Sequence, residues 1–233
     1  MVEEEVEIFT NLPASVDLRP NCPPVYDQLQ LEASTPNAVA AAIHILLITN
    51  SQTLYTPSRL FIYYGARSTE GDISDNKPVT IPDCINVCTS LGVCTEDTMP
   101  YAPLRFVAPP TAAAYTEALT HLVTASSPVA QTAMALQTAL YAGHPIIFNF
   151  DGYEKFFKDI VDQTGVLKVP EVWEELVQPW SAVIVGYDSG AQIFWVRNSL
   201  SDAWGNAGYF TMPYEYVLNP TMARDFWIIT AIN

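Results

Sequence analysis

The longest apolar stretch of the sequence lies near the start of the chain and predicts its central element. The run from Ala38 to Ile48 is apolar almost all round, which predicts a helix that is buried on most sides. Thr35 or Ser34 can cap the start of this helix, and Pro36 suits its first turn, where a missing N–H costs nothing. The run is shorter than the roughly 20 apolar residues that a membrane span needs. We therefore predict a central buried helix.

The rest of the pattern predicts helices first and strands afterwards. The proline-rich residues 12–25 exclude a helix interior. Apolar spacing predicts further helices at residues 58–67, 83–91, 112–125 and 129–142, the last with Gly143 at its C-cap. Short apolar runs predict strands at residues 146–150, 182–187, 193–197, 208–212 and 226–231. This order is typical of an α+β protein.

Length and composition indicate a compact protein with two parts. The chain has 233 residues, of which 49% are hydrophobic and 15% are charged, so it has enough apolar side chains to form a substantial core. Residues 1–11 are acidic and are expected to form a tail or an extra edge strand. We expect a helical lobe at about residues 25–125 and a β-rich lobe at about residues 126–233, with residues 12–24 added to it.

The charge balance excludes some classes of partner. The net charge is −15, which argues against nucleic acid or an anionic membrane surface as a partner. A basic protein is a better electrostatic match. The alternative, which we weigh equally, is that the acidity only keeps the protein in solution.

The four cysteines, Cys22, Cys84, Cys88 and Cys94, do not form a dense disulfide framework. No nearby His completes a zinc site, so reduced buried thiols are expected, with no metal and no cofactor. The first residues are acidic and lack the apolar segment of a signal peptide, which predicts an intracellular protein or one packaged inside something made in the cell.

The candidate chemistry lies where a polar loop enters the central helix. The start of a helix stabilises negative charge and therefore suits a nucleophile. The residue at this place is Ser34, and Gln28 precedes it by six residues.

These residues give the chain a resemblance to the papain-like cysteine peptidases. In that family a Gln is followed six residues later by the nucleophilic Cys, and a His and an Asn lie far downstream. Here Ser34 stands at the Cys position. The segment that begins at Ser181 is similar to the family's His-Ala-Val, and Asn198 matches the family's Asn, 17 residues later. The resemblance continues through residues 204–210 and covers nearly the whole chain.

The resemblance implies a fold with a helical lobe, built on a long central helix, beside an antiparallel, barrel-like β lobe. It also implies that the family's Cys and His have become Ser34 and Ser181. The neighbours differ as well, because Glu32 and Trp180 stand where the family has small residues, and Leu200 replaces a Trp. We regard these three side chains as candidates for filling the cleft.

None of the three histidines is expected to serve as a replacement base. His44 lies ten residues into the central helix, roughly 15 Å along its axis from Ser34. His121 and His144 lie in or after other predicted helices. Because a hydroxyl cannot accept the proton that an imidazole would, we expect an inactive site at which Gln28 and Asn198 serve the fold.

We therefore predict a catalytically inactive pseudopeptidase, similar to papain-like proteins of bacteria and large DNA viruses. Its expected role is protein binding or scaffolding, with a basic or structural protein as partner and self-association as an alternative, inside the cell or within a virus particle. Two other functions are left open. The first is a decoy or adaptor that binds peptide in an open cleft without cutting it. The second is a weak serine-type hydrolase that uses Ser34 and a nearby base.

Overall fold

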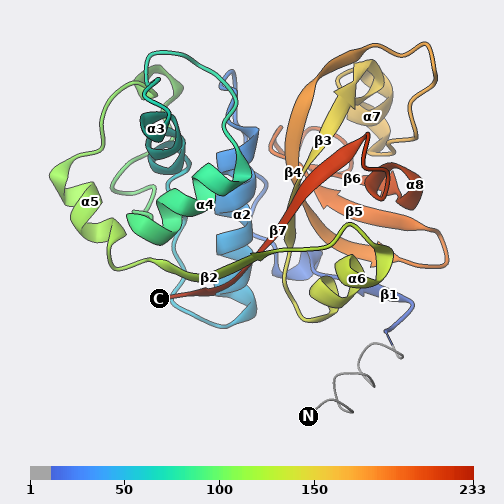
Figure 1. Ribbon diagram of the computed structural model, residues 1–233, viewed down its shortest axis with the longest axis horizontal. Helices are drawn as coiled ribbons and strands as arrows, with labels where there is room; N and C mark the ends of the chain where they lie inside the picture. Colours follow the sequence, from blue (N-terminus) through green and yellow to red (C-terminus); the bar gives the residue numbers. More distant parts are fainter. Residues whose placement is uncertain (1–11) are drawn as a thin grey trace.

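The structure, a computed structural model, describes residues 12–233 and has a helical part beside a sheet (Figure 1). The predicted acidic tail, residues 1–11, lies outside the described residues. The α-helices are α2 Ser34–Thr49, α3 Arg59–Thr69, α4 Ile81–Ser90, α5 Ala112–Ala118, α6 Ala133–Tyr141, α7 Asp159–Thr164 and α8 Tyr214–Val217. The short 3-10 helices are η1 Arg19–Asn21, η2 Pro103–Arg105 and η3 Glu154–Phe156. The strands are β1 Ser15–Asp17, β2 Val123–Pro128, β3 Ile146–Tyr153, β4 Leu176–Asp188, β5 Ile193–Arg197, β6 Tyr209–Pro213 and β7 Ala223–Ile232.

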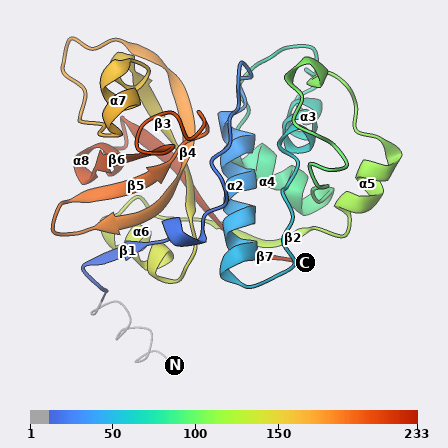
Figure 2. The ribbon, with the colours of Figure 1, turned by 180° about the vertical axis from the view of Figure 1, so that it is seen from behind.

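The predicted central helix is α2, and it stands between α3, α4 and α5 on one side and the sheet on the other (Figures 1 and 2). Its residues from Ser34 to Leu47 are all buried, as expected of a helix that is apolar all round. The predicted cap is wrong, because the N-cap position is Ala33 and no side chain caps the helix. The hydroxyl of Thr35 lies inside the first turn and donates to the carbonyl oxygen of Val79 instead. Among the described helices, none has the length and apolar character to cross a membrane.

The other predicted helices are present with different limits. Ser58 caps α3 and Thr80 caps α4, each by accepting a backbone N–H three residues later. The helix predicted at residues 112–125 ends at Ala118, and β2 follows it. This part of the prediction is wrong because β2 pairs with β7, about 100 residues away in the sequence, and a local pattern cannot reveal such a pairing. The last helix of the series, α6, begins after a cap at Thr132.

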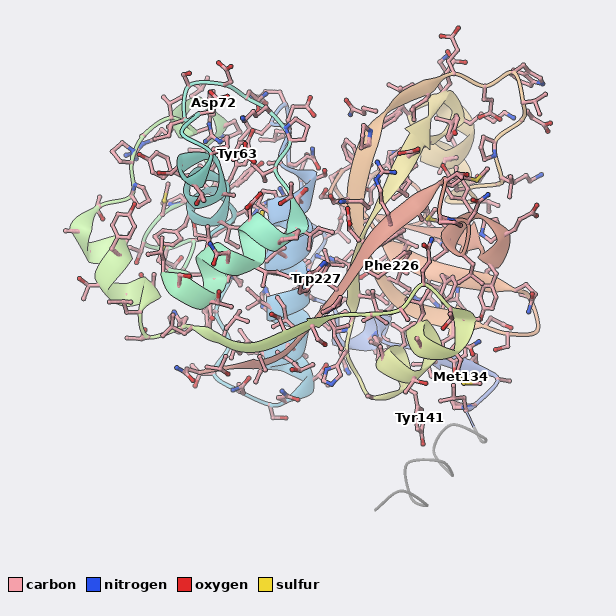
Figure 3. All side chains as sticks on the ribbon, viewed as in Figure 1. Tyr63, Asp72, Met134, Tyr141, Phe226 and Trp227 are labelled. Carbon is pink, nitrogen blue, oxygen red and sulfur yellow. The ribbon has the colours of Figure 1, made fainter. Side chains whose placement is uncertain are left out.

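The sheet is antiparallel and has the strand order β2-β7-β3-β4-β5-β6, with β1 paired to β4. Its two most buried strands are β3 and β4, which run beside each other from Ile146 opposite Ile184 to Asn149 opposite Ser181 and beyond. One end of β7 crosses toward α2, and the labelled Phe226 and Trp227 mark that crossing (Figure 3). The strand β4 also lies directly beside the buried helix α2.

All four cysteines lie within the described residues, and each is a free thiol. Cys84, Cys88 and Cys94 are buried, and burial raises the pKa of Cys88 and of Cys94 to about 12. Cys22 is half-buried. Within residues 12–233, no group of three His, Cys, Asp or Glu side chains is arranged to hold a metal ion.

Candidate functional site

The position expected for the nucleophile lies at the junction of helix and sheet. Ser34 is the first residue of α2 and is only 8% exposed. Its hydroxyl oxygen accepts the backbone N–H of Ser181, on β4, at 3.3 Å. The structure therefore brings together these two positions, which are 147 residues apart in the sequence, although a backbone atom and not a side chain makes the contact.

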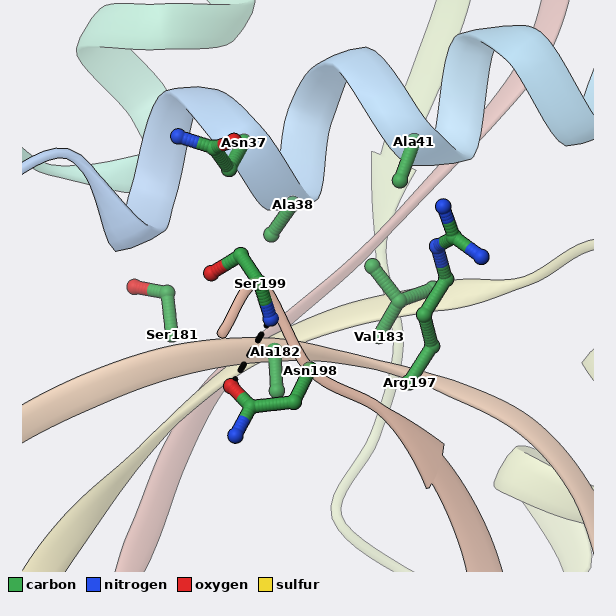
Figure 4. Close-up of a pocket in the computed structure, with 9 residues that line it drawn as sticks. All are labelled: Asn37, Ala38, Ala41, Ser181, Ala182, Val183, Arg197, Asn198 and Ser199. Carbon is green, nitrogen blue, oxygen red and sulfur yellow. Dashed lines mark hydrogen bonds between the residues drawn. The ribbon is translucent and has the colours of Figure 1, made fainter. Parts of the chain in front are cut away.

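The side chain of Ser181 points toward α2, as Figure 4 shows. Its hydroxyl donates to the side-chain oxygen of Asn149 at 2.6 Å and lies 2.8 Å from the hydroxyl of Thr35. Asn149 comes from the neighbouring strand β3, directly opposite Ser181. Sequence reasoning missed Asn149, because only the strand register connects it to the site.

Asn198 faces a different side chain. Its oxygen Oδ1 accepts the indole N–H of Trp180 at 2.9 Å and the backbone N–H of Ser199 at 2.9 Å, the second of these drawn in Figure 4. Trp180 is 5% exposed, and its ring packs edge-on against Phe156 and Phe157. Trp180 and Asn198 therefore form a buried, hydrogen-bonded pair. The donor is the indole N–H of Trp180, the residue next to Ser181 in β4.

Gln28 is held by its own loop and by the sheet. Its side-chain oxygen accepts the hydroxyl of Ser199 at 2.6 Å, and its side-chain nitrogen donates to the carbonyl oxygen of Leu31 at 2.9 Å. Its backbone N–H also donates to the carbonyl oxygen of Ser199. Gln28 therefore fastens the loop before α2 to the segment that carries Asn198.

The other two side chains predicted to fill the cleft are half-buried. Glu32 lies two residues before Ser34, and its backbone N–H donates to the side chain of Asn76 at 2.9 Å. Leu200 packs against the core, and its backbone bridges that of Asp27. Of the three candidates, only Trp180 is buried among aromatic rings.

The histidines lie away from Ser34. The Nδ1 atom of His44 is 3.0 Å from the hydroxyl of Tyr26, and burial lowers the pKa of His44 to about 4. The ring of His121 stacks on Tyr55 with 4.1 Å between the ring centroids. Burial also lowers the pKa of His144. Within residues 12–233, no His, Lys or carboxylate side chain hydrogen-bonds to the hydroxyl of Ser34.

A small cavity lies beside the site, between α2 and the sheet (Figure 4). Its lining includes Asn37 and Ala38 from α2 and Ser181 and Asn198 from the sheet side. Its volume is about 10 Å³, which is at the lower limit for a single water molecule. The cavity cannot hold a peptide side chain.

Comparison with known proteins gives consistent results. The model of the family "Papain family cysteine protease" matches residues 80–225, a span that includes Ser181 and Asn198 but not Ser34. An uncharacterized peptidase C1-like protein of Acanthamoeba polyphaga mimivirus is 34% identical over an alignment of 216 residues that covers 89% of this chain and 70% of that protein.

Solved structures agree on the fold. Xylellain, a cysteine protease from Xylella fastidiosa, is 34% identical with a TM-score of 0.92, over 97% of this chain and 89% of that chain. The digestive procathepsin L 3 of Tenebrio molitor is similar in fold alone, with 19% identity and a TM-score of 0.72, over 94% of this chain and 70% of that chain. The fold predicted from the sequence, a helical part beside an antiparallel sheet, is confirmed.

Proposed function

This chain belongs to the papain family of cysteine proteases, and we propose that it keeps the family's fold as a catalytically inactive protein that binds other proteins. The observation that carries the first part is the surroundings of Ser34, whose hydroxyl accepts a backbone N–H and meets no base among residues 12–233. A serine nucleophile needs an adjacent base, because its hydroxyl keeps its proton at neutral pH. In this proposal Ser34 stands in place of the family's Cys, and the family's His has been lost.

The size of the expected loss supports inactivity. Removing the nucleophile or the base of such a triad costs on the order of 10⁶ in rate, and the remaining contacts supply only residual stabilisation. The hydroxyl of Ser181 has nearby partners in Asn149 and Thr35. The low exposure of Ser34 and Trp180 argues against an open cleft and hence against a peptide-binding decoy.

We expect the unaltered protein to leave a peptide library uncut and to resist labelling by a fluorophosphonate. The reason is the missing base, and the readout is mass spectrometry of the peptides and of the protein. Ser34→Ala is the matched control, and its background labelling should equal that of the unaltered chain. Labelling at Ser34 that the Ser34→Ala variant lacks would establish the weak serine hydrolase instead. Peptides retained without cleavage would support the decoy.

The protein-binding part of the proposal rests on an exposed apolar surface, here called the α7–β4 surface. It is the segment from the end of α7 to the start of β4, in which Val166, Val172, Trp173, Leu176 and Val177 are 45–104% exposed. Exposed apolar side chains are typical of sites of protein interaction, and Trp is enriched among the residues that carry binding energy.

The exposed tryptophan of this surface has neighbours that fix its position. The ammonium group of Lys155 lies 4.9 Å from the ring centroid of Trp173 and pairs with Glu174 at 2.5 Å. Trp173 is therefore presented to solvent, at 67% exposure, while a neighbouring charge pair orders its ring. The net charge of −15 favours a basic partner for this surface.

We expect the unaltered protein to co-purify with a stoichiometric partner at low salt from its native source, which can be a virus particle. We expect Trp173→Glu to abolish this co-purification. A carboxylate in the centre of an apolar contact is left without a partner and weakens binding. The matched control is Met134→Glu on α6, which is 54% exposed and lies on a different face (Figure 3). Equal recovery with Trp173→Glu, or an unaltered chain that is always recovered alone and monomeric, would contradict this role.

A further inference from the structure

Neighbouring side chains of β4 serve opposite faces of the sheet. Successive residues of a strand point to opposite sides, and the contacts follow this rule at positions 180 and 181. The hydroxyl of Ser181 reaches Asn149 and Thr35 on the side of α2. The indole of Trp180 reaches Asn198 and the rings of Phe156 and Phe157. Of these two positions, only position 180 shares a face with Asn198.

The chemistry of a Cys-His-Asn site sets two conditions for the position of the base. The base must lie beside the nucleophile, and it must be held by the third residue, here Asn198. The Ser34 hydroxyl accepts from the nitrogen of the peptide bond that joins Trp180 to Ser181, so the backbone of both residues runs beside Ser34. The side chain of Trp180 also bonds to Asn198 at 2.9 Å. Both positions therefore have their backbone beside Ser34, and of the two side chains only that of position 180 bonds to Asn198, as the second condition requires.

We infer that Trp180, and not Ser181, stands in the place of the catalytic base; this inference rests on the proposed function of the same site. Its Nε1–H donates to Asn198 as the N–H of an imidazole would. An indole nitrogen is a donor only, so it cannot take a proton from Ser34. The hydrogen bond between position 180 and Asn198, which would orient the base, is thus kept. The imidazole that would accept the proton is replaced by an indole ring, which cannot.

The sequence alone favours Ser181, because Ala182 and Val183 follow it as in the family motif. A shift of one residue in the count along a strand moves each side chain to the opposite face. The pairing of β4 with β5 has a register irregularity between Ile184 and Gly186. A shift of one residue between this strand and the family motif can occur there. The contacts of the side chains decide between the two positions, and they favour Trp180.

The test restores a thiol and places a histidine at each of the two positions. We compare Ser34→Cys alone with Ser34→Cys/Trp180→His and Ser34→Cys/Ser181→His. The readout is the rate of alkylation by iodoacetamide at position 34 as a function of pH, mapped by mass spectrometry. An unpaired thiol titrates near pH 8.5, whereas a thiol paired with an imidazolium titrates at about 3.5–7.5.

We expect only the Ser34→Cys/Trp180→His protein to titrate at least one unit lower than Ser34→Cys, with alkylation at pH 6 about tenfold faster. The same lowering in Ser34→Cys/Ser181→His alone, or a lowering in neither, would overturn the inference. Thermal unfolding checks that each variant is folded.

If Ser34→Cys/Trp180→His does not fold, hydrogen exchange of the Trp180 indole in the unaltered chain replaces it. A protected indole N–H then supports the inference, and a freely exchanging one overturns it. The proposed inactivity fails separately, through fluorophosphonate labelling of Ser34 in the unaltered protein.

Discussion

Replacing Trp180 with Ala is expected to lower the free energy of unfolding by about 3–5 kcal/mol, the usual cost of removing a large buried aromatic side chain. Trp180 is 5% exposed, and its ring contacts those of Phe156 and Phe157 at centroid distances of 5.8 and 5.4 Å. The change also removes the indole donor to Asn198. Urea unfolding followed by circular dichroism measures the effect.

The variant Trp180→Phe separates packing from hydrogen bonding. It keeps an aromatic ring and lacks the N–H, so the buried oxygen of Asn198 retains only the backbone donor from Ser199. A buried acceptor that loses a donor costs about 1–3 kcal/mol. If Trp180→Phe is as stable as the unaltered chain, the hydrogen bond to Asn198 contributes nothing to stability. If Trp180→Ala lowers the free energy of unfolding by less than about 1 kcal/mol, that result would contradict the place of Trp180 in the core.

Replacing Arg67 with Met is expected to lower the free energy of unfolding by about 3 kcal/mol or more, because several buried acceptors lose a charged donor at once. Arg67 is fully buried in α3. Its guanidinium donates to the carbonyl oxygens of Tyr63, Ile73, Asp75 and Phe106. It therefore joins the helix to two loops. Thermal or urea unfolding gives the value.

The matched control for this change is Arg105→Met. Arg105 is exposed, at the end of η2, so the same substitution should change the free energy of unfolding by no more than about 0.5 kcal/mol. Equal effects at the two positions would show that the bonds of Arg67 do not contribute to stability.

The fold was predictable from the sequence where burial is local. The all-round apolar run of α2 and the continuous apolar run in β4 identify a buried helix and a buried strand without knowledge of their neighbours. By contrast, β2 has several exposed positions and gains its strand conformation by pairing with β7. Its sequence therefore resembles the end of a helix until the pairing is known.

The candidate site was predictable in its parts and not in its connections. The resemblance to the papain family identifies Ser34 and Asn198, and the structure brings both to the junction of α2 and the sheet. Asn149 has no motif of its own, because β3 supplies it through strand register. The choice between Trp180 and Ser181 depends on which face of β4 each occupies, and a single residue of shift reverses that choice.

The measurement that tests the central claim most directly is hydrogen exchange of the Trp180 indole N–H in the unaltered protein. The claim is that this N–H is bonded to Asn198 in the place of a base, so that Ser34 has no proton acceptor. NMR resolves the indole signals, Trp180→Phe assigns the one in question, and the exposed Trp173 serves as an internal reference. We predict that the Trp180 signal exchanges far more slowly than that of Trp173. Exchange as fast as that of Trp173 would contradict the account.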